Sequence, residues 1–327
     1  MIVDTTVQER AISHPTDSKL LETARLKRVD ASREAGVTLK QTYKSEGREL
    51  SYRAVRYAHA RQFRRMRRVI RRQRTIVGRL LREIQRKVRK PTWALEAVHA
   101  KTITLLEQTQ SRKNISGGSK LYSWHAPQAE CINKGKSKRP YEFGGKVGIA
   151  STFRGNLIVG ARAFAGNPYD GHTLWEQLDQ ASVLMQDTGV KPTEVTVDLG
   201  YRGVDGQNPS VRIRHRGKKC RLTEKDVREL KRRQAFEPII GHLKADHRMD
   251  RCHLKGEMGD RIHAVLCAAG YNLRWLMRNL AKKHRKAFLA LLQPAVTGNH
   301  AAYLSSADRG GQYRSSIPLE QSDVEAS

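Results

Sequence analysis

The sequence predicts a mixed α/β fold with a large, basic helical insertion after the first strand. Three observations support this: a β-branched run at the start, arginine-rich helical periodicity over residues 48–90, and strand-like alternation after residue 140. The predicted order is a strand, a basic helical block, a hairpin, a helix, a strand and further helices. This order is typical of a mixed α/β domain interrupted by helices.

The first strand is predicted from the run Ile2-Val3-Asp4-Thr5-Thr6-Val7, which is rich in β-branched residues. Helices are expected over residues 17–44 and 93–108. Between them, apolar residues recur at helical spacing through residues 48–90, with Pro91 as a stop. This block is expected to form one long amphipathic helix or a helical hairpin with a cationic outer face.

The second half of the chain has a different texture. Residues 143–152 and 156–164 alternate as a hairpin, and short strands are expected at 194–199 and 211–214. Helices are predicted over 170–188, with Asp170 as N-cap, and over 223–247 and 260–292. A polar, disordered tail is expected after Pro294.

Composition limits the function. The chain has 327 residues and a formal net charge of +30, from 62 basic and 32 acidic side chains. Such an excess favours a polyanionic partner, nucleic acid before a membrane surface. No apolar run approaches the roughly 18 residues that cross a bilayer, and the chain does not open with a signal-peptide pattern. We therefore expect a cytoplasmic protein without a membrane partner.

Arginines of the basic block are candidates for DNA contact. The alternative is a solvated cationic face, the usual fate of a charge run. Because such density carries a self-repulsion that bound phosphate would relieve, DNA contact is favoured. The candidates are Arg64, Arg65, Arg67, Arg68, Arg71 and Arg72.

Three acidic residues are candidates for catalysis. Asp4 lies on the first predicted strand, Asp198 ends the strand Val195-Thr196-Val197, and Glu237 lies on a predicted helix with Arg233 and Lys244. Converging carboxylates bind Mg²⁺ or Mn²⁺, and two such ions support phosphodiester cleavage. Each residue also has an ordinary explanation. Asp198 suits a turn or cap, Glu237 an intrahelical ion pair, and Asp4 a chain end without function.

Several segments resemble bacterial insertion-sequence transposases of the DDE class, in particular insertion-sequence family five. They are Lys120–Pro127, Tyr141–Gly144, Gly166–Leu174, Asp198–Gly203 and Arg233–Lys244 continuing through Met249. The resemblance extends from Asp4 to about Leu280, with the motifs in the family's order. One departure is Leu230, where a tyrosine that contacts DNA is expected.

The resemblance implies an RNase H-like catalytic domain and a transposase that cleaves element ends and joins them to target DNA. It assigns Asp4, Asp198 and Glu237 to two Mg²⁺ or Mn²⁺ ions, and Arg233 and Lys244 to phosphates near the scissile bond. Tyr201 and Arg202 could contact DNA or form an ordinary turn. The helical DNA-recognition domain that family members carry before the first catalytic strand is not expected here, so the alternative is a truncated remnant that only binds DNA.

This reading divides the chain into four parts. Residues 1–16 supply the first strand of the catalytic core, and residues 17–115 form the basic helical insertion. Residues 116–293 supply the rest of the RNase H-like core and the C-terminal helices, and residues 294–327 form the tail. The expected partners are double-stranded DNA, as element ends and target, and further copies of the chain in a homodimer or larger assembly. The expected setting is the bacterial nucleoid.

Overall fold

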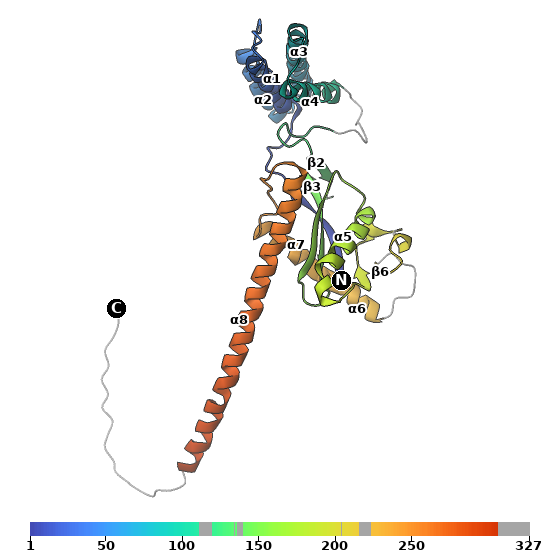
Figure 1. The fold of residues 1–327 in the computed structure, drawn as a ribbon. Coiled ribbons are helices and arrows are strands. Elements are labelled where there is room, and N and C mark those ends of the chain that lie inside the picture. The colour runs from blue at the N-terminus through green and yellow to red at the C-terminus, as the bar shows by residue number, and fades with distance from the viewer. Residues whose placement is uncertain (111–119, 134, 136–139, 204, 216–223, 307–327) are drawn as a thin grey trace, which may run out of the picture. The chain divides into compact units, whose positions relative to one another are not determined.

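The computed structural model describes residues 1–110, 120–133, 135, 140–203, 205–215 and 224–306. The fold is mixed α/β, as the sequence predicts (Figure 1). Its sheet has six strands among these residues: β1 (Ile2–Glu9), β2 (Glu130–Asn133), β3 (Tyr141–Ser151), β4 (Ile158–Phe164), β5 (Glu194–Thr196) and β6 (Arg212–Arg214).

The strand order is β2-β3-β1-β5-β6, and β4 also pairs with β3. Strands β1, β3 and β4 pair antiparallel, whereas β1 and β5, and then β5 and β6, pair parallel. The predicted hairpin is therefore confirmed as β3 and β4. Strand β2 was not predicted from the sequence.

Helices cover both faces of the sheet because neighbouring residues of each strand point to opposite sides. Ile2 and Ile149 pack in one hydrophobic cluster with α7 (Phe236–Ala245) and the beginning of α8 (Gly256–Ser306). Val3 and Ala150, the next residue in each strand, pack in the other cluster with α5 (Asp170–Leu184). The core of the sheet thus lies in two layers, one on each face.

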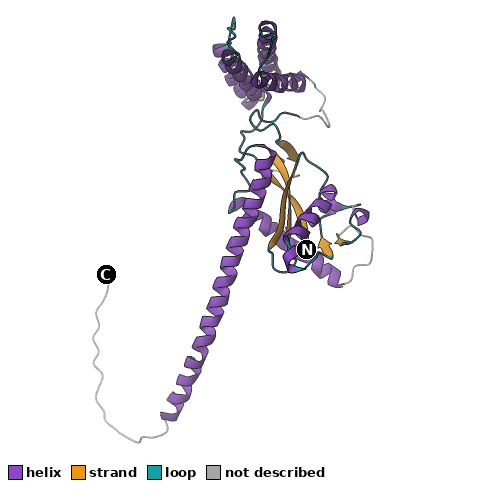
Figure 2. Cartoon of the chain, viewed as in Figure 1, coloured by secondary structure: helices purple, strands orange, loops and turns teal. Residues whose placement is uncertain are grey.

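The helices between β1 and β2 are α1 (Asp17–Glu34), α2 (Lys44–His59), α3 (Phe63–Lys87) and α4 (Trp93–Gln110) (Figure 2). A break after His59, with Arg61 at a positive φ of 54°, divides the arginine-rich block into two helices that pack on each other. The helical-hairpin alternative is therefore the one that the structure adopts.

Two helical predictions differ from the structure near the C-terminus. The segment predicted as one helix over 223–247 is divided into α6 (Glu224–Arg232), a short 3-10 turn η4 (Arg233–Ala235) and α7. Helix α8 begins before residue 260 and continues beyond Pro294 to Ser306. The remainder of the expected tail, 307–327, lies outside the described residues, as does the expected boundary at 115–116. No helix in the described part of the chain combines the length and apolarity needed to cross a bilayer.

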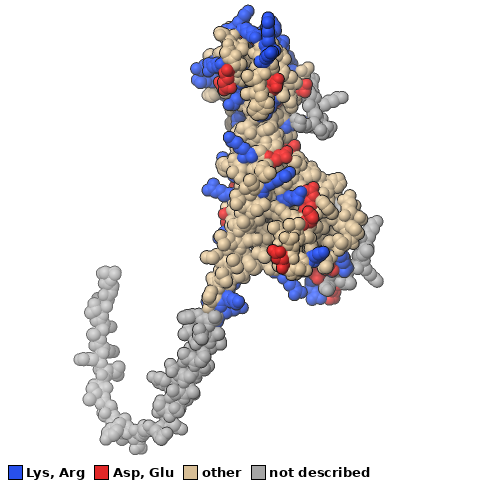
Figure 3. Space-filling view, viewed as in Figure 1, with Lys and Arg blue, Asp and Glu red and all other residues tan. Residues whose placement is uncertain are grey.

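Helix α3 has two chemically different faces. Val69, Ile76, Val77 and Leu80 are buried against the neighbouring helices. The arginines at the expected outer positions are exposed, with Arg72 partly covered. Figure 3 shows Lys and Arg side chains gathered over the α1–α4 helices. The amphipathic helix that the sequence predicts is thus confirmed: its apolar face is buried and its cationic face is exposed.

Polar anchors fix the end of β1. The Gln8 amide donates to Asp260 Oδ1 at 3.1 Å, and the Arg10 guanidinium forms an ion pair with the same carboxylate. Arg10 also donates to the backbone oxygens of Leu254 and Gly256. These buried bonds hold the first strand to the beginning of α8, and so fix the strand that carries Asp4.

We expect Arg28→Met in α1 to raise the free energy of unfolding by about 1–3 kcal/mol. Arg28 is fully buried, with a described Nε bond to Thr102 Oγ1 at 3.1 Å and a contact to His99 Nδ1 at 3.2 Å. Its Nη1 has no hydrogen-bond partner among the described residues, and burial lowers the pKa of the guanidinium to about 10. Because the folded pKa lies below the unfolded one, burial penalises the charged form throughout the neutral range.

Urea denaturation at pH 7 checks this prediction, with the exposed Arg33→Met in the same helix as control. The control is expected to change stability by less than about 0.5 kcal/mol. A clear loss of stability in Arg28→Met would contradict the prediction, because it would mean that the guanidinium is well compensated in the folded state.

Candidate functional site

The parallel register of β1 and β5 brings Asp4 and Asp198 together. Ile2 pairs with Thr196, so two residues further along each chain Asp4 lies abreast of Asp198. A step of two residues keeps the same face of a strand, and neighbouring strands are about 4.8 Å apart. Two carboxylates that are 194 positions apart in the sequence therefore lie close together.

One guanidinium joins the two carboxylates. Arg233 Nη2 lies 2.8 Å from Asp4 Oδ2 and 3.3 Å from Asp198 Oδ2. Each Oδ1 accepts a hydrogen bond from the next backbone amide, Thr5 N at 2.8 Å and Leu199 N at 2.7 Å. The two Asp side chains are thus held in the same way, with one oxygen fixed by the backbone and the other turned to Arg233.

The two carboxylates differ in exposure. The Asp4 side chain is 15% exposed and that of Asp198 is 52% exposed. Burial raises the pKa of Asp4, although the charge of Arg233 and the Thr5 amide oppose this effect, and the negative charge of Asp198 adds to it. Asp4 is therefore the constrained member of the pair, and Asp198 the member open to solvent.

Asp198 also has the ordinary role that its sequence context allowed. It is the N-cap of the 3-10 turn η2 (Leu199–Tyr201), through the bond from the Leu199 amide. The cap uses Oδ1 and leaves Oδ2 facing Arg233. Asp198 can therefore cap the turn and take part in the candidate site at the same time, because the two roles use different oxygens.

Glu237 is not in contact with the pair in the described residues. Its helix, α7, buries Phe236 and Ile239 against the face of the sheet that carries Ile2, while the Glu237 side chain is exposed. In the described residues, no group of three or more acidic, histidine or cysteine side chains is arranged to hold a metal ion. The structure thus brings together Asp4 and Asp198, with Arg233, but not Glu237.

Lys244 is engaged in an ion pair with a residue of β3. Its ammonium lies 3.2 Å from Glu142 Oε2, and Glu142 is buried. The prediction that Lys244 contacts a phosphate therefore requires that this pair opens or that the phosphate approaches the remaining hydrogens of the ammonium.

Asp170 was expected to cap a helix, and this prediction is wrong. The N-cap of α5 is Tyr169, which makes no side-chain cap bond. Asp170 Oδ1 instead accepts from Thr5 Oγ1 at 2.8 Å and from Lys146 Nζ at 2.9 Å. Asp170 therefore links α5 to the residue that follows Asp4. The Gly166–Leu174 segment was noted in the sequence, but nothing in it indicated Lys146 or Thr5 as partners.

We expect Gly200→Ala to disturb the turn that follows Asp198. A Cβ at Gly200 would lie 2.8 Å from Asp170 Oδ2, so the alanine and the carboxylate cannot both keep their positions. The resemblance noted in the sequence implies metal-dependent DNA cleavage, and for that activity the expected result is roughly a tenfold loss. Gly206→Ala, whose Cβ would meet nothing within 4 Å, is the matched control and is expected to behave as the unaltered chain. Equal activity of the two variants would contradict the prediction.

Other predicted DNA contacts have different fates. Tyr201 is fully buried beside α5, and burial raises its pKa above its ordinary value, so its ring is not available to DNA in this structure. Arg202 is exposed. In α3, Arg72 forms a two-bond ion pair with Glu46, at 2.6 and 3.0 Å. The remaining candidates are exposed: Arg64, Arg65, Arg67, Arg68 and Arg71.

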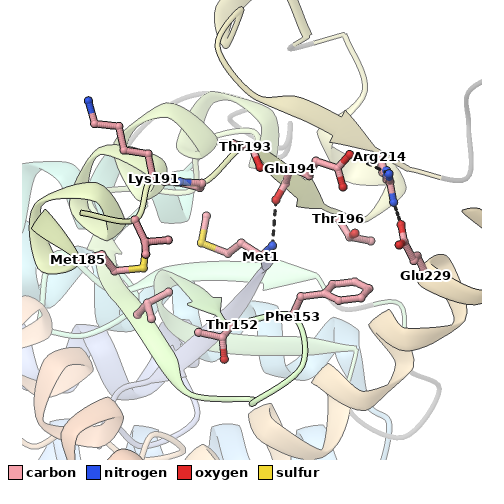
Figure 4. Close-up of a pocket in the computed structure, with 13 residues that line it drawn as sticks. Met1, Thr152, Phe153, Met185, Lys191, Thr193, Glu194, Thr196, Arg214 and Glu229 are labelled. Carbon is pink, nitrogen blue, oxygen red and sulfur yellow. Dashed lines mark hydrogen bonds and ion pairs between the residues drawn. The ribbon is translucent and has the colours of Figure 1, made fainter. Parts of the chain in front are cut away.

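A pocket of about 320 Å³ lies near the start of β1, and neither carboxylate lines it (Figure 4). Met1 and Met185 contribute to its apolar wall, and the Met1 amino group donates to the Glu194 carbonyl oxygen at 2.9 Å. Arg214 and Glu229 form an ion pair at its rim. Because this pocket does not include Asp4, Asp198 or Arg233, it is separate from the candidate site.

The donor set fits a divalent metal ion in part. Both Oδ2 atoms face one cationic nitrogen, so they lie no more than about 6 Å apart. Carboxylate oxygens are the ligands that Mg²⁺ and Mn²⁺ prefer, and one or two carboxylates often suffice alongside water and phosphate. Asp4 and Asp198 therefore form a pair of carboxylates of the kind that such an ion prefers, and Arg233 supplies their counter-charge in this structure.

Comparisons with known proteins cover part of the chain. Residues 206–277 match the family model described as a transposase DDE domain, a range that contains Arg233, Glu237 and Lys244 but neither aspartate of the pair. A curated Rhizobium meliloti protein, described as uncharacterized protein ORF8 in the nfe locus, is 49% identical over 61 residues. That alignment covers 19% of this chain and 30% of the relative's length. No solved structure matches. Together with the carboxylate pair, the family match supports a DDE-type transposase.

Proposed function

We propose that the chain is a DDE transposase that cleaves the ends of an insertion element and joins them to target DNA. The observation that carries the proposal is the meeting of Asp4, on β1, and Asp198, just after the parallel strand β5, with Oδ2 atoms that face one cation. The similarity of residues 206–277 to a transposase DDE domain supplies the reaction class.

The sheet supports an RNase H-like assignment. That fold joins three antiparallel strands to parallel ones beside the first strand. The pairing of β1 with β3, β3 with β4, β1 with β5 and β5 with β6 follows this arrangement. We propose that residues 1–16 and 116–293 form the catalytic core, that 17–115 are an insertion, and that 294–327 are a tail. Within the DDE class, we propose that the chain belongs to insertion-sequence family five.

In this function the protein's own groups orient the substrate. Asp4, Asp198 and Glu237 would hold two Mg²⁺ or Mn²⁺ ions, with Glu237 moving toward the pair. When bound, such ions polarise the scissile phosphate and activate the attacking oxygen. Arg233 and Lys244 would bind phosphate oxygens near the cleaved bond, and Arg202 would contact the DNA beside them.

The arginines of α3 would bind parts of the DNA other than the phosphodiester that is cleaved. Helix α3 and the residues Arg89 and Lys90 that follow it contain a dense run of Arg and Lys, and Glu83 is the single acidic residue between Phe63 and Lys90. Contacts from such a face are to the phosphate backbone, so they add affinity without reading sequence. Because two element ends must be held together, we propose a homodimer or larger assembly on DNA, in the bacterial cytoplasm and nucleoid.

One observation favours a second candidate, a DNA-binding remnant without catalysis. Glu237 is exposed and makes no described contact with Asp4 or Asp198, so the three-carboxylate set is incomplete in this conformation. The cationic face of α3 does not depend on that set. A protein of this kind would bind duplex DNA but would not cut it.

A nicking experiment tests the proposed function. The full chain is incubated with supercoiled plasmid carrying the DNA that flanks its gene, in Mg²⁺, Mn²⁺ or EDTA. The transposase proposal predicts nicks with 3′-hydroxyl ends in either metal and none in EDTA. DNA binding without nicking in any metal would overturn the proposal in favour of the remnant.

A further inference from the structure

Arg233 occupies the position that a shared metal ion would take. Its Nη2 lies between the two Oδ2 atoms, at 2.8 Å from Asp4 and 3.3 Å from Asp198. Both other oxygens are already bonded to backbone amides, so Oδ2 is the atom that each carboxylate offers to a cation. A guanidinium and a divalent ion therefore compete for the same two oxygens.

The site needs a positive charge even without metal. Two carboxylates whose facing oxygens are within about 6 Å repel each other, and the limited exposure of Asp4 strengthens this repulsion. The positive charge of Arg233 offsets this repulsion and keeps the carboxylates of Asp4 and Asp198 close together. Removal of Arg233 would leave the two negative charges without a described counter-ion and would make the site a better ligand for a cation.

The Arg233 contact is incompletely satisfied. Its Nε is buried and has no hydrogen-bond partner among the described residues, although the side chain as a whole is 22% exposed. Arg233 lies in the turn η4, between α6 and α7, rather than inside a helix. The guanidinium thus has an unmet donor and a route to solvent, where a phosphate could accept two parallel bonds from it.

We propose that Arg233 is a displaceable counter-ion: it holds Asp4 and Asp198 together without metal, and it transfers to a DNA phosphate when divalent cations enter. The inference rests on the proposed function, because it requires that this pair binds metal. Its consequence is positive coupling. Metal binding frees a DNA-binding group, so DNA binding must favour metal binding by the same factor.

Mn²⁺ binding to the full chain without DNA tests whether Arg233 and the metal ion compete for the two carboxylates. Electron paramagnetic resonance measures the affinity. We expect Arg233→Gln to bind Mn²⁺ at least about tenfold more tightly than the unaltered chain, because the competing cation is gone. Arg228→Gln, an exposed residue on α6, makes the same change of charge and is expected to shift the affinity less than about twofold. Arg233→Lys, which has one nitrogen and a shorter reach, should lie between them.

DNA binding tests the transfer. Fluorescence anisotropy with a labelled duplex should show that Ca²⁺ strengthens binding by the unaltered chain about fivefold or more, and that Arg233→Gln loses most of this gain. Circular dichroism verifies that each variant is folded. If Arg233→Gln is not folded, Arg233→Lys takes its place in the comparison.

The outcomes separate the inference from the proposed function. Equal or weaker Mn²⁺ binding by Arg233→Gln, with binding abolished by Asp198→Asn, would overturn the counter-ion role and leave the metal site standing. Absence of Mn²⁺ binding in every protein would overturn both.

Discussion

Asp198→Asn and Asp4→Asn should each reduce metal-dependent DNA cleavage by on the order of 10³-fold or more. Each removes one of the two carboxylates that face Arg233 Nη2, and an amide oxygen binds a divalent cation far more weakly than a carboxylate. The substitution retains the shape of the side chain and the oxygen that accepts from the next amide. Cleavage of labelled duplex under single-turnover conditions gives the rate.

DNA affinity should not fall in these variants. Removal of a negative charge lowers the repulsion of phosphate, so the affinity should be unchanged or slightly higher. The control is Asp187→Asn, an exposed residue in the turn after α5 and outside the site. Parallel loss of binding and cleavage, with folding intact, would contradict the assigned roles.

Asp4→Asn should also change the free energy of unfolding in a pH-dependent way. Burial raises the folded pKa of Asp4 above its unfolded value, so the ionised side chain is a cost at neutral pH. The cost disappears as the pH falls through the folded pKa toward the unfolded value of 3.8. Asp4→Asn should therefore be at least as stable as the unaltered chain at pH 7, and this advantage should shrink toward pH 4. Arg233 retains Asp198 as a partner throughout.

Elements with a strong local pattern could be predicted from the sequence. The β-branched run at Ile2 becomes β1, and the alternating segments become the β3–β4 hairpin. The end of α2 could not be located, because the residues around Arg61 have ordinary helical composition and the break depends on a left-handed residue. The short strand β2 owes its pairing to β3 alone, and its own sequence has no alternation to detect.

The candidate site shows the same division between local and distant information. Asp4 and Asp198 were found because each carboxylate lies on or after an apolar strand, and the pairing of those strands then brings them together. Asp170 was misinterpreted because its local context suits an N-cap, whereas its partners Thr5 and Lys146 lie on the strands β1 and β3. The position of Glu237 relative to the pair is a tertiary property, so helical spacing could not determine it.

The triple variant Arg64→Gln/Arg68→Gln/Arg71→Gln should weaken binding to duplex DNA on the order of 10²-fold near 0.1 M salt. Offsets of four and seven place these exposed arginines on one side of α3, where a phosphate backbone could contact all of them. Each lost phosphate contact removes about 0.9 from the slope of log K against log salt, so the slope should fall by about 2.7. Anisotropy titrations between 50 and 300 mM salt measure both quantities.

Arg72→Gln is the matched control for this prediction, because the structure separates it from its neighbours. Its guanidinium makes two bonds to Glu46, so it has little left to offer a phosphate, and loss of the pair leaves Glu46 partly exposed to water. The salt slope should therefore stay within about 0.3 of the unaltered value. A slope that falls equally in Arg72→Gln and in each single variant of the other three would mean that α3 acts through total charge alone. A triple variant with an unchanged slope would exclude this face of α3 from the DNA contact, because counterion release at the phosphates could not then involve it.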